Sequence, residues 1–246
     1  MSDSNGGVVP LSDEPVALDI LRRSIHGLWD TVNNLTRLRP TRHDRYRVTI
    51  FGSARVGPDH WVYGVVRDVA AELTRLGCDI VTGGGPGLMQ AANEGANLAN
   101  PDGTQQQSMG IRVELPFEQD VNAFVTEAFE HKTFFTRLHH FVLVSDAFIV
   151  MPGGIGTMLE ALMVWQLLQV RHLYDTPLIL AGRFWDGLID WVRAAMLNPD
   201  APLVCPEDLT IPQILTDGPS IVRAVREHHA QWREKQSQPA SRHTES

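Results

Sequence analysis

One carboxylate, Glu160, follows a glycine-rich loop closely enough to act on whatever the loop holds. The loop is Pro152-Gly153-Gly154-Ile155-Gly156-Thr157, and Glu160 comes three residues after its last member. This spacing predicts that Thr157 and Glu160 share the first turn of one helix and face the loop. A carboxylate held there can stabilise positive charge or activate a water molecule. The same T-x-x-E spacing is that of a capping box, so the local sequence leaves catalysis and helix capping open.

A second glycine cluster is expected to help bind an anion. It is Gly83-Gly84-Gly85-Pro86-Gly87, followed by Met89, and we call residues 83–87 the first glycine loop and residues 152–157 the second. Glycines let backbone N–H groups approach a ligand, and the helix expected after each loop adds partial positive charge. At a third strand-to-loop junction, Ser53 offers a hydroxyl at the end of the first expected strand. Tight turns without a ligand are the alternative, and neither a dinucleotide fingerprint nor a Walker loop is present.

Arg137 is a candidate positive partner for the site. It lies in the helix expected to lead into the strand before the second glycine loop. Its guanidinium could bind a phosphate or ribose hydroxyls in bidentate fashion. An ordinary surface ion pair is the alternative for a helical arginine.

The elements that must position these residues alternate between short strands and longer helices. The alternation predicts an α/β fold, a Rossmann-like parallel sheet flanked by helices, with its ligand site at the carboxyl ends of strands. Strands are expected at residues 47–51, 79–82, 109–113, 147–151 and 177–181, and helices at 62–76, 88–99, 133–144, 158–168, 185–196 and 221–232.

One domain is expected over residues 13–233, including an N-terminal helix with an apolar stripe that must pack on the body or on a second subunit. Residues 1–12 and 234–246 are polar and are expected to be disordered tails.

Composition argues against several classes of partner. The formal net charge of −8 is unsuited to a broad nucleic-acid-binding face. The N-terminus lacks the apolar segment of a signal peptide or membrane anchor, so a cytoplasmic protein without membrane association is expected. Two cysteines and ten histidines show no metal-binding spacing, so no metal site is predicted.

At these residues the sequence resembles the LOG (LONELY GUY) family, often labelled "possible lysine decarboxylase". The resemblance covers about residues 47–196 and rests on the motif P-G-G-x-G-T-x-x-E at residues 152–160. The motif G-G-G-P-G-x-M at residues 83–89, followed by Ala91-Ala92-Asn93, is similar to that of the family's longer-chain branch. This sequence departs from the family pattern at Gln90 and at Met158-Leu159, where acidic residues are common.

The resemblance implies a nucleoside 5'-monophosphate phosphoribohydrolase that works without a cofactor. Such an enzyme hydrolyses the N-glycosidic bond of AMP or a cytokinin riboside 5'-monophosphate to free base and ribose 5-phosphate. Matched residue by residue, the family's catalytic arginine and glutamate fall on Arg137 and Glu160. The two glycine loops would bind the phosphate of this small-molecule nucleotide. A homodimer or higher homo-oligomer, with sites near the subunit contact, is also implied.

Two other functions compete with hydrolysis. A pyridoxal phosphate-dependent decarboxylase needs a Schiff-base lysine, and this chain has only Lys132 and Lys235, so we expect no such enzyme. A non-catalytic carrier of a nucleotide or of molybdenum cofactor could use the same fold and loops. Because a carrier of an anion gains little from a carboxylate beside it, the presence of both Arg137 and Glu160 favours the enzyme.

Overall fold

The computed structural model describes residues 14–35, 44–102, 107–114 and 121–237. The chain divides into two compact units, residues 1–41 and residues 42–246, and each is described by itself. Most of the expected tail residues, 1–12 and 238–246, lie outside the described residues, so disorder there stays a prediction.

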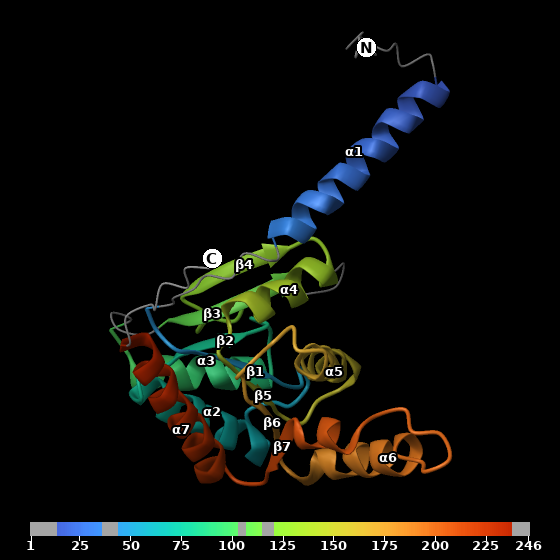
Figure 1. Ribbon diagram of the computed structural model, residues 1–246. Coiled ribbons are helices and arrows are strands. Elements are labelled where there is room, and N and C mark those ends of the chain that lie inside the picture. Colours follow the sequence, from blue (N-terminus) through green and yellow to red (C-terminus); the bar gives the residue numbers. More distant parts are fainter. Residues whose placement is uncertain (1–13, 36–43, 103–106, 115–120, 238–246) are drawn as a thin grey trace. The chain divides into compact units, whose positions relative to one another are not determined.

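The larger unit is built on a seven-stranded sheet (Figure 1). All its strands are parallel, as the sequence predicts. The strand order is β4-β3-β2-β1-β5-β6-β7. The chain adds β2, β3 and β4 on one side of β1 and then crosses to place β5 on the other side. The point between β1 and β5 is therefore the switch point at which open α/β sheets bind ligands. The strands are β1 (Arg47–Phe51), β2 (Asp79–Thr82), β3 (Ser108–Val113), β4 (Glu127–His131), β5 (Ala147–Val150), β6 (Leu178–Ala181) and β7 (Pro212–Leu215).

Helices cover both faces of this sheet and bury one hydrophobic core on each (Figure 1). Side chains alternate between the faces, so Ile149 of β5 enters one core and Phe148 enters the other. Because both faces are covered, β5 and β6 are apolar along their whole length. On the face of Ile149 lie α2 (Trp61–Arg75), α3 (Leu88–Ala99) and α7 (Gly218–Ser237); on the face of Phe148 lie α4 (Phe134–Val144), α5 (Ile155–Gln169) and α6 (Asp186–Met196).

Two strands were missing from the sequence prediction. The edge strand β4 carries partly exposed residues along its whole length, and its sequence EAFEH lacks an apolar run. The edge strand β7 has only four residues and begins with a proline. Short 3₁₀ helices at Arg183–Trp185 and Pro206–Thr210 were also not predicted. One further difference from the prediction bears on function. The helix α5 begins at Ile155, three residues before its predicted start at residue 158.

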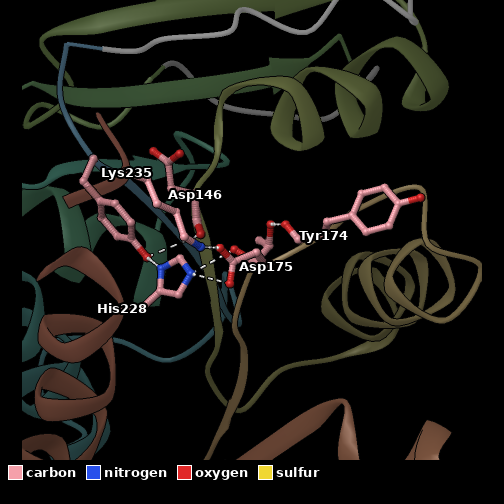
Figure 2. A network of polar contacts seen from close by, with 7 residues as sticks. Asp146, Tyr174, Asp175, His228 and Lys235 are labelled. Atoms are coloured by element: carbon pink, nitrogen blue, oxygen red, sulfur yellow. Dashed lines mark hydrogen bonds and ion pairs between the residues drawn. The ribbon is translucent and has the colours of Figure 1, made fainter. Parts of the chain in front are cut away.

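A polar network fixes α7 to the amino-terminal ends of the strands (Figure 2). The Tyr46 hydroxyl lies 2.6 Å from His228 Nδ1, and His228 Nε2 lies 2.8 Å from the carbonyl oxygen of Asp175. Lys235 forms an ion pair with the carboxylate of Asp175. Tyr46 precedes β1, whereas Asp175 precedes β6, so the network joins α7 to two strands. It lies at the opposite end of the sheet from the glycine loops.

The smaller unit contains the expected N-terminal helix, α1 (Glu14–Leu35). Among the described residues, no helix combines the length and apolarity needed to cross a membrane.

In the larger unit, the helix α7 continues to Ser237, four residues into the segment expected to be a tail.

Candidate functional site

The backbone of Ser53 holds the two glycine loops side by side at the switch point. Its N–H donates to the carbonyl of Pro152 at 3.1 Å, and its own carbonyl accepts from the N–H of Leu88 at 2.9 Å. Ser53 follows β1, Leu88 begins α3, and Pro152 follows β5. Ser53 was predicted to offer its hydroxyl, but that oxygen accepts from the N–H of Arg55 at 3.1 Å. The structural role of Ser53 is therefore carried by its backbone.

The first glycine loop packs closely against the end of β1. A Cβ on Gly87 would lie 2.4 Å from the carbonyl oxygen of Ser53, and Gly87 has a φ of +69°. Both features exclude a side chain at this position. The N–H of Gly84 donates to Thr82 Oγ1 at 2.9 Å, which closes the turn from the other side. The loop therefore has a fixed backbone before any ligand binds.

Two asparagines that the sequence analysis did not assign to the site support the first glycine loop. Asn122 donates from its side chain to the carbonyl of Gly85 at 3.0 Å and from its backbone to the carbonyl of Gly84 at 2.9 Å. The same side chain donates to Asn93 Oδ1 at 3.0 Å. Asn93 is fully buried and also accepts from Thr82 Oγ1 at 2.7 Å. The signal in the sequence was a polar Asn93 on an otherwise apolar helix face, since a buried amide needs partners.

The second glycine loop leads into α5 without a side-chain cap. The N-cap residue is Gly154, and no side chain accepts a hydrogen bond from the first turn of the helix. Gly154, Ile155 and Gly156 are exposed. Because the first N–H groups of a helix have no intrahelical acceptor, they face solvent here and can bind an anion.

The capping-box interpretation of Thr157 and Glu160 is wrong. The helix begins at Ile155, so Thr157 is its third residue and cannot be the cap, and Glu160 lies beyond the first turn. Thr157 packs against Gly153, where an added Cβ would come within 2.2 Å of Thr157 Oγ1. The Glu160 carboxylate is therefore not used to cap the helix.

Glu160 instead pairs with Arg137. Arg137 Nη1 lies 3.3 Å from Glu160 Oε1, and the exposed fractions of the two side chains are only 13% and 11%. Arg137 Nε donates to the carbonyl of Ile111 at 2.9 Å, and its guanidinium lies 5.3 Å from the centre of the Phe141 ring. These contacts fix the guanidinium against β3 and α4. Arg137 is thus a positioned, mostly buried arginine rather than an ordinary surface ion-pair partner.

The buried ion pair lies against the first glycine loop. A Cβ on Gly83 would come within 2.4 Å of Arg137 Nη2 and within 2.6 Å of Met89 Sδ. Arg137 therefore occupies the space that a side chain at residue 83 would need. Gly83 is not among the residues that the sequence predicts for the site, although it belongs to the same glycine run. The structure brings Gly83, Met89, Arg137 and Glu160 together beside the predicted phosphate-binding loops, whereas Pro86 and Ile155 are exposed.

Burial gives Glu160 an unusual proton affinity. Loss of solvent raises the pKa of its carboxyl from an ordinary 4.5 to about 7, although the Arg137 guanidinium acts in the opposite direction. Carboxyls with a pKa near neutrality are typical of acid–base sites. Among the described residues, no group of three or more His, Cys, Asp or Glu side chains could hold a metal ion.

Comparison with protein families agrees with this geometry. Residues 89–224 match the sequence model of the family described as "Possible lysine decarboxylase", the LOG family. The chain belongs to this family. The matched segment contains Arg137, Glu160 and the second glycine loop.

The chain is similar to one named relative and to solved structures of the same fold. Pyrimidine/purine nucleotide 5'-monophosphate nucleosidase of Escherichia coli strain K12 is 29% identical over 140 residues, which are 55% of this chain. The match covers only 30% of that relative. The solved protein TM1055, a structural genomics target, has a TM-score of 0.54 at 19% identity, covering 74% of this chain and 99% of its own.

The molybdenum cofactor carrier protein of Chlamydomonas reinhardtii has a TM-score of 0.53 at 16% identity, covering 76% and 99% of the two chains. At such identities the two solved structures show a shared Rossmann-like fold and nothing finer. They confirm the fold class predicted for this LOG-family chain.

Proposed function

We propose that this protein hydrolyses the N-glycosidic bond of a nucleoside 5'-monophosphate, such as AMP or a cytokinin riboside 5'-monophosphate. The products would be the free base and ribose 5-phosphate. The observation that carries the proposal is the buried pair of Arg137 and Glu160, 3.3 Å apart and in contact with the first glycine loop. Membership of the LOG family and similarity to a nucleotide 5'-monophosphate nucleosidase support it.

Glu160 is suited to the chemical step of this reaction. Cleavage of the C1'–N bond leaves its electron pair on the base and builds positive charge on the ribose ring. The ionised Glu160 carboxylate stabilises that charge and accepts a proton from the attacking water. The water oxygen bonds to C1', and a proton from solvent completes the departing base. Neither step needs a cofactor.

The glycine loops and Arg137 would position the substrate. The exposed N–H groups at the start of α5 and the backbone of the first glycine loop bind the 5'-phosphate. Arg137 holds the Glu160 carboxylate in one orientation and has Nη2 directed toward Gly83, where a ribose hydroxyl or phosphate oxygen can accept from it. Binding the remote phosphate thereby places C1' against Glu160.

The family's descriptive label does not fit the lysines of this chain. Lys235 is paired with Asp175 at the end of the sheet opposite the glycine loops. Lys132 is exposed and lies two residues before α4. A pyridoxal phosphate-dependent reaction requires a lysine that reaches the cofactor in its pocket. We therefore favour hydrolysis over decarboxylation.

Carriage of a nucleotide or of molybdenum cofactor without turnover is the second candidate, because the fold is shared with a molybdenum cofactor carrier protein. The two candidates make opposite demands on Glu160. A carboxylate beside a bound anion weakens binding, so a carrier would bind more tightly after Glu160→Gln. A hydrolase would lose turnover after the same change.

The test is release of free base from AMP and other nucleoside monophosphates, followed by chromatography. We expect release by the wild type and a loss of about 10²-fold or more in Glu160→Gln, which cannot accept the proton. Glu72→Gln changes an exposed acid on α2 and should keep wild-type turnover. Tight binding with no base released from any nucleotide would overturn the hydrolase and support the carrier.

Assembly and location follow from the same proposal. Phe135 and Ile155 flank the site with exposed fractions of 81% and 86%. Large exposed apolar side chains are typical of a contact surface. We therefore assign them to a homodimer interface beside the site. The cytoplasmic location that the sequence predicts is part of the same proposal.

A further inference from the structure

Two carbonyl groups of the first glycine loop are bound by one residue, Asn122. The carbonyl of Gly84 accepts from the backbone N–H of Asn122 at 2.9 Å, and the carbonyl of Gly85 accepts from Asn122 Nδ2 at 3.0 Å. A carbonyl oxygen directed at an anion would repel it, because both carry negative charge. By binding both oxygens, Asn122 draws them to its own side of the loop.

The same contacts fix the direction of the Gly85 N–H. In a planar trans peptide, the C=O and the N–H point in opposite directions. The carbonyl of Gly84 points at Asn122, so the N–H of Gly85, in the same peptide unit, points away from Asn122. Gly85 is half-buried, and its N–H has no acceptor among the described residues. A backbone N–H that is fixed but has no partner is a ready donor to an anion.

Asn122 uses every polar atom of its side chain. Its Oδ1 accepts from the N–H of Phe124 at 3.1 Å, which closes a tight turn. Its Nδ2 donates one hydrogen to the carbonyl of Gly85 and the other to Asn93 Oδ1, at 3.0 Å in each case. A reversed amide would place an oxygen against two acceptors. The side chain therefore has one orientation.

A buried network connects Asn122 to the sheet. Asn93 of α3 accepts from Thr82 Oγ1, at the end of β2, at 2.7 Å and donates to Ser108 Oγ, at the start of β3, at 2.8 Å. These three residues are at most 2% exposed. Buried polar groups that are fully paired are costly to disturb. The sheet therefore sets the orientation of Asn122 before a ligand binds.

We propose that Asn122 is the positioning residue through which the first glycine loop selects a substrate with a 5'-phosphate. It acts through the loop backbone and not by contact with the substrate. It turns the peptide between Gly84 and Gly85 so that the Gly85 N–H donates to a phosphate oxygen. The inference rests on the proposed function, because it assigns the phosphate of that substrate to this loop. Hydrogen bonds to a charged acceptor are the stronger ones, so this donor favours a nucleotide over a nucleoside.

The test is Asn122→Ser. A serine hydroxyl can still accept from the N–H of Phe124 and keep the turn, but it is too short to reach both Gly85 and Asn93. We expect the KM for AMP to rise at least about tenfold, the effect of losing one hydrogen bond to a charged group. The value of kcat should change much less. A merely structural defect would have the opposite signature, because a smaller folded fraction lowers kcat and leaves KM unchanged.

Asn198→Ser is the matched control. Asn198 is exposed after α6, and its Oδ1 accepts from the N–H of Asp200 at 3.0 Å, so it closes the same kind of turn. Among the described residues, its Nδ2 has no acceptor. Both kcat and KM of this variant should equal those of the wild type.

Calorimetric titration with AMP separates this inference from the proposed function, because it measures binding without turnover. A wild type that binds AMP but releases no base would overturn the hydrolase, and the Kd values of wild type and Asn122→Ser would still decide the role of Asn122. Equal KM and Kd in these two proteins would overturn that role, and so would a fall in kcat at unchanged KM. Binding of no nucleoside monophosphate by the wild type would overturn both.

Asn122→Asp is a second variant in case the serine variant does not fold, which circular dichroism establishes. Aspartate has the shape of asparagine and keeps the acceptor for Phe124, but it replaces both Nδ2 hydrogens with an oxygen. The KM and Kd for AMP should rise at least as much as in Asn122→Ser. Wild-type values in Asn122→Asp would contradict the proposed role.

Discussion

Glu160 and Arg137 come from different helices and form a buried ion pair with 3.3 Å between Oε1 and Nη1. Arg137 is in turn fixed by the carbonyl of Ile111 and the ring of Phe141. The pair therefore has one arrangement before substrate binds. A carboxylate held in this way incurs little reorganisation cost when positive charge develops beside it.

The first prediction concerns the pH dependence of turnover. Burial raises the pKa of Glu160 to about 7, and the proposed mechanism needs the ionised carboxylate. The value of kcat/KM should therefore rise with pH through about 7 and then level off. The substrate phosphate also titrates, near pH 6, and would act on any variant. In Glu160→Gln, the pH dependence of the residual kcat/KM should reflect only the titration of the substrate phosphate. If kcat/KM of this variant still rose with a midpoint near pH 7, as in the wild type, Glu160 would not be the ionising group.

The same pKa predicts that Glu160 reduces stability in alkaline solution. Below pH 4.5 the carboxyl is protonated in both the folded and the unfolded chain, so the raised pKa costs nothing. Between pH 4.5 and about 7 the folded chain binds more protons than the unfolded chain, so stability falls as pH rises. The full cost, at most about 3 kcal/mol, is present above pH 7.

Glu160→Gln should therefore raise the free energy of unfolding more at pH 8 than at pH 4. Urea denaturation at the two pH values measures the difference, with Glu72→Gln as the exposed control. An equal effect of Glu160→Gln at both pH values would mean that its carboxyl titrates normally in the folded chain.

The third prediction is that Gly83→Ala displaces Arg137. The added Cβ would lie 2.4 Å from Arg137 Nη2 and 2.6 Å from Met89 Sδ, so both side chains must move. Gly64→Ala is a suitable control because its Cβ meets nothing within 4 Å on α2. We expect Gly83→Ala to lose most turnover, while Gly64→Ala keeps it and gains up to about 1 kcal/mol of stability from helix propensity. Wild-type turnover in Gly83→Ala would show that the position of Arg137 is not critical.

The fold was largely predictable because its central strands are short buried runs, and β1, β2 and β6 are each followed directly by a glycine. The strands at Arg47–Phe51 and Asp79–Thr82 have the predicted bounds, and the helix Leu88–Ala99 does too. Edge strands were harder because only part of an edge strand is buried. The polar sequence of β4 therefore resembles a loop until its pairing with β3 is known.

The sequence identifies candidate site residues but not the contacts that hold them. Sequence placed Glu160 near a glycine loop, yet it could not choose between capping and catalysis because both need the same T-x-x-E spacing. The start of α5 at Ile155 decides against capping. The supporting roles of Asn122 and of the Ile111 carbonyl depend on long-range packing. A backbone carbonyl leaves no trace in residue type, so no sequence pattern could have identified it.

The last prediction separates stability from turnover at the opposite end of the sheet. The Tyr46 hydroxyl lies 2.6 Å from His228 Nδ1 and donates to the carbonyl of Asp146 at 3.4 Å, while His228 Nε2 lies 2.8 Å from the carbonyl oxygen of Asp175. Tyr46→Phe leaves the ring in the core but removes the partner of His228, which should lower the free energy of unfolding by about 1 to 2 kcal/mol. Tyr174→Phe, at a residue 64% exposed, should change it little. Because Tyr46 precedes β1 and the glycine loops follow the strands, base release per folded molecule should be unchanged in both variants. A selective loss of turnover in Tyr46→Phe, with the unfolding curve unaltered, would mean that the α7 anchor is coupled to the site.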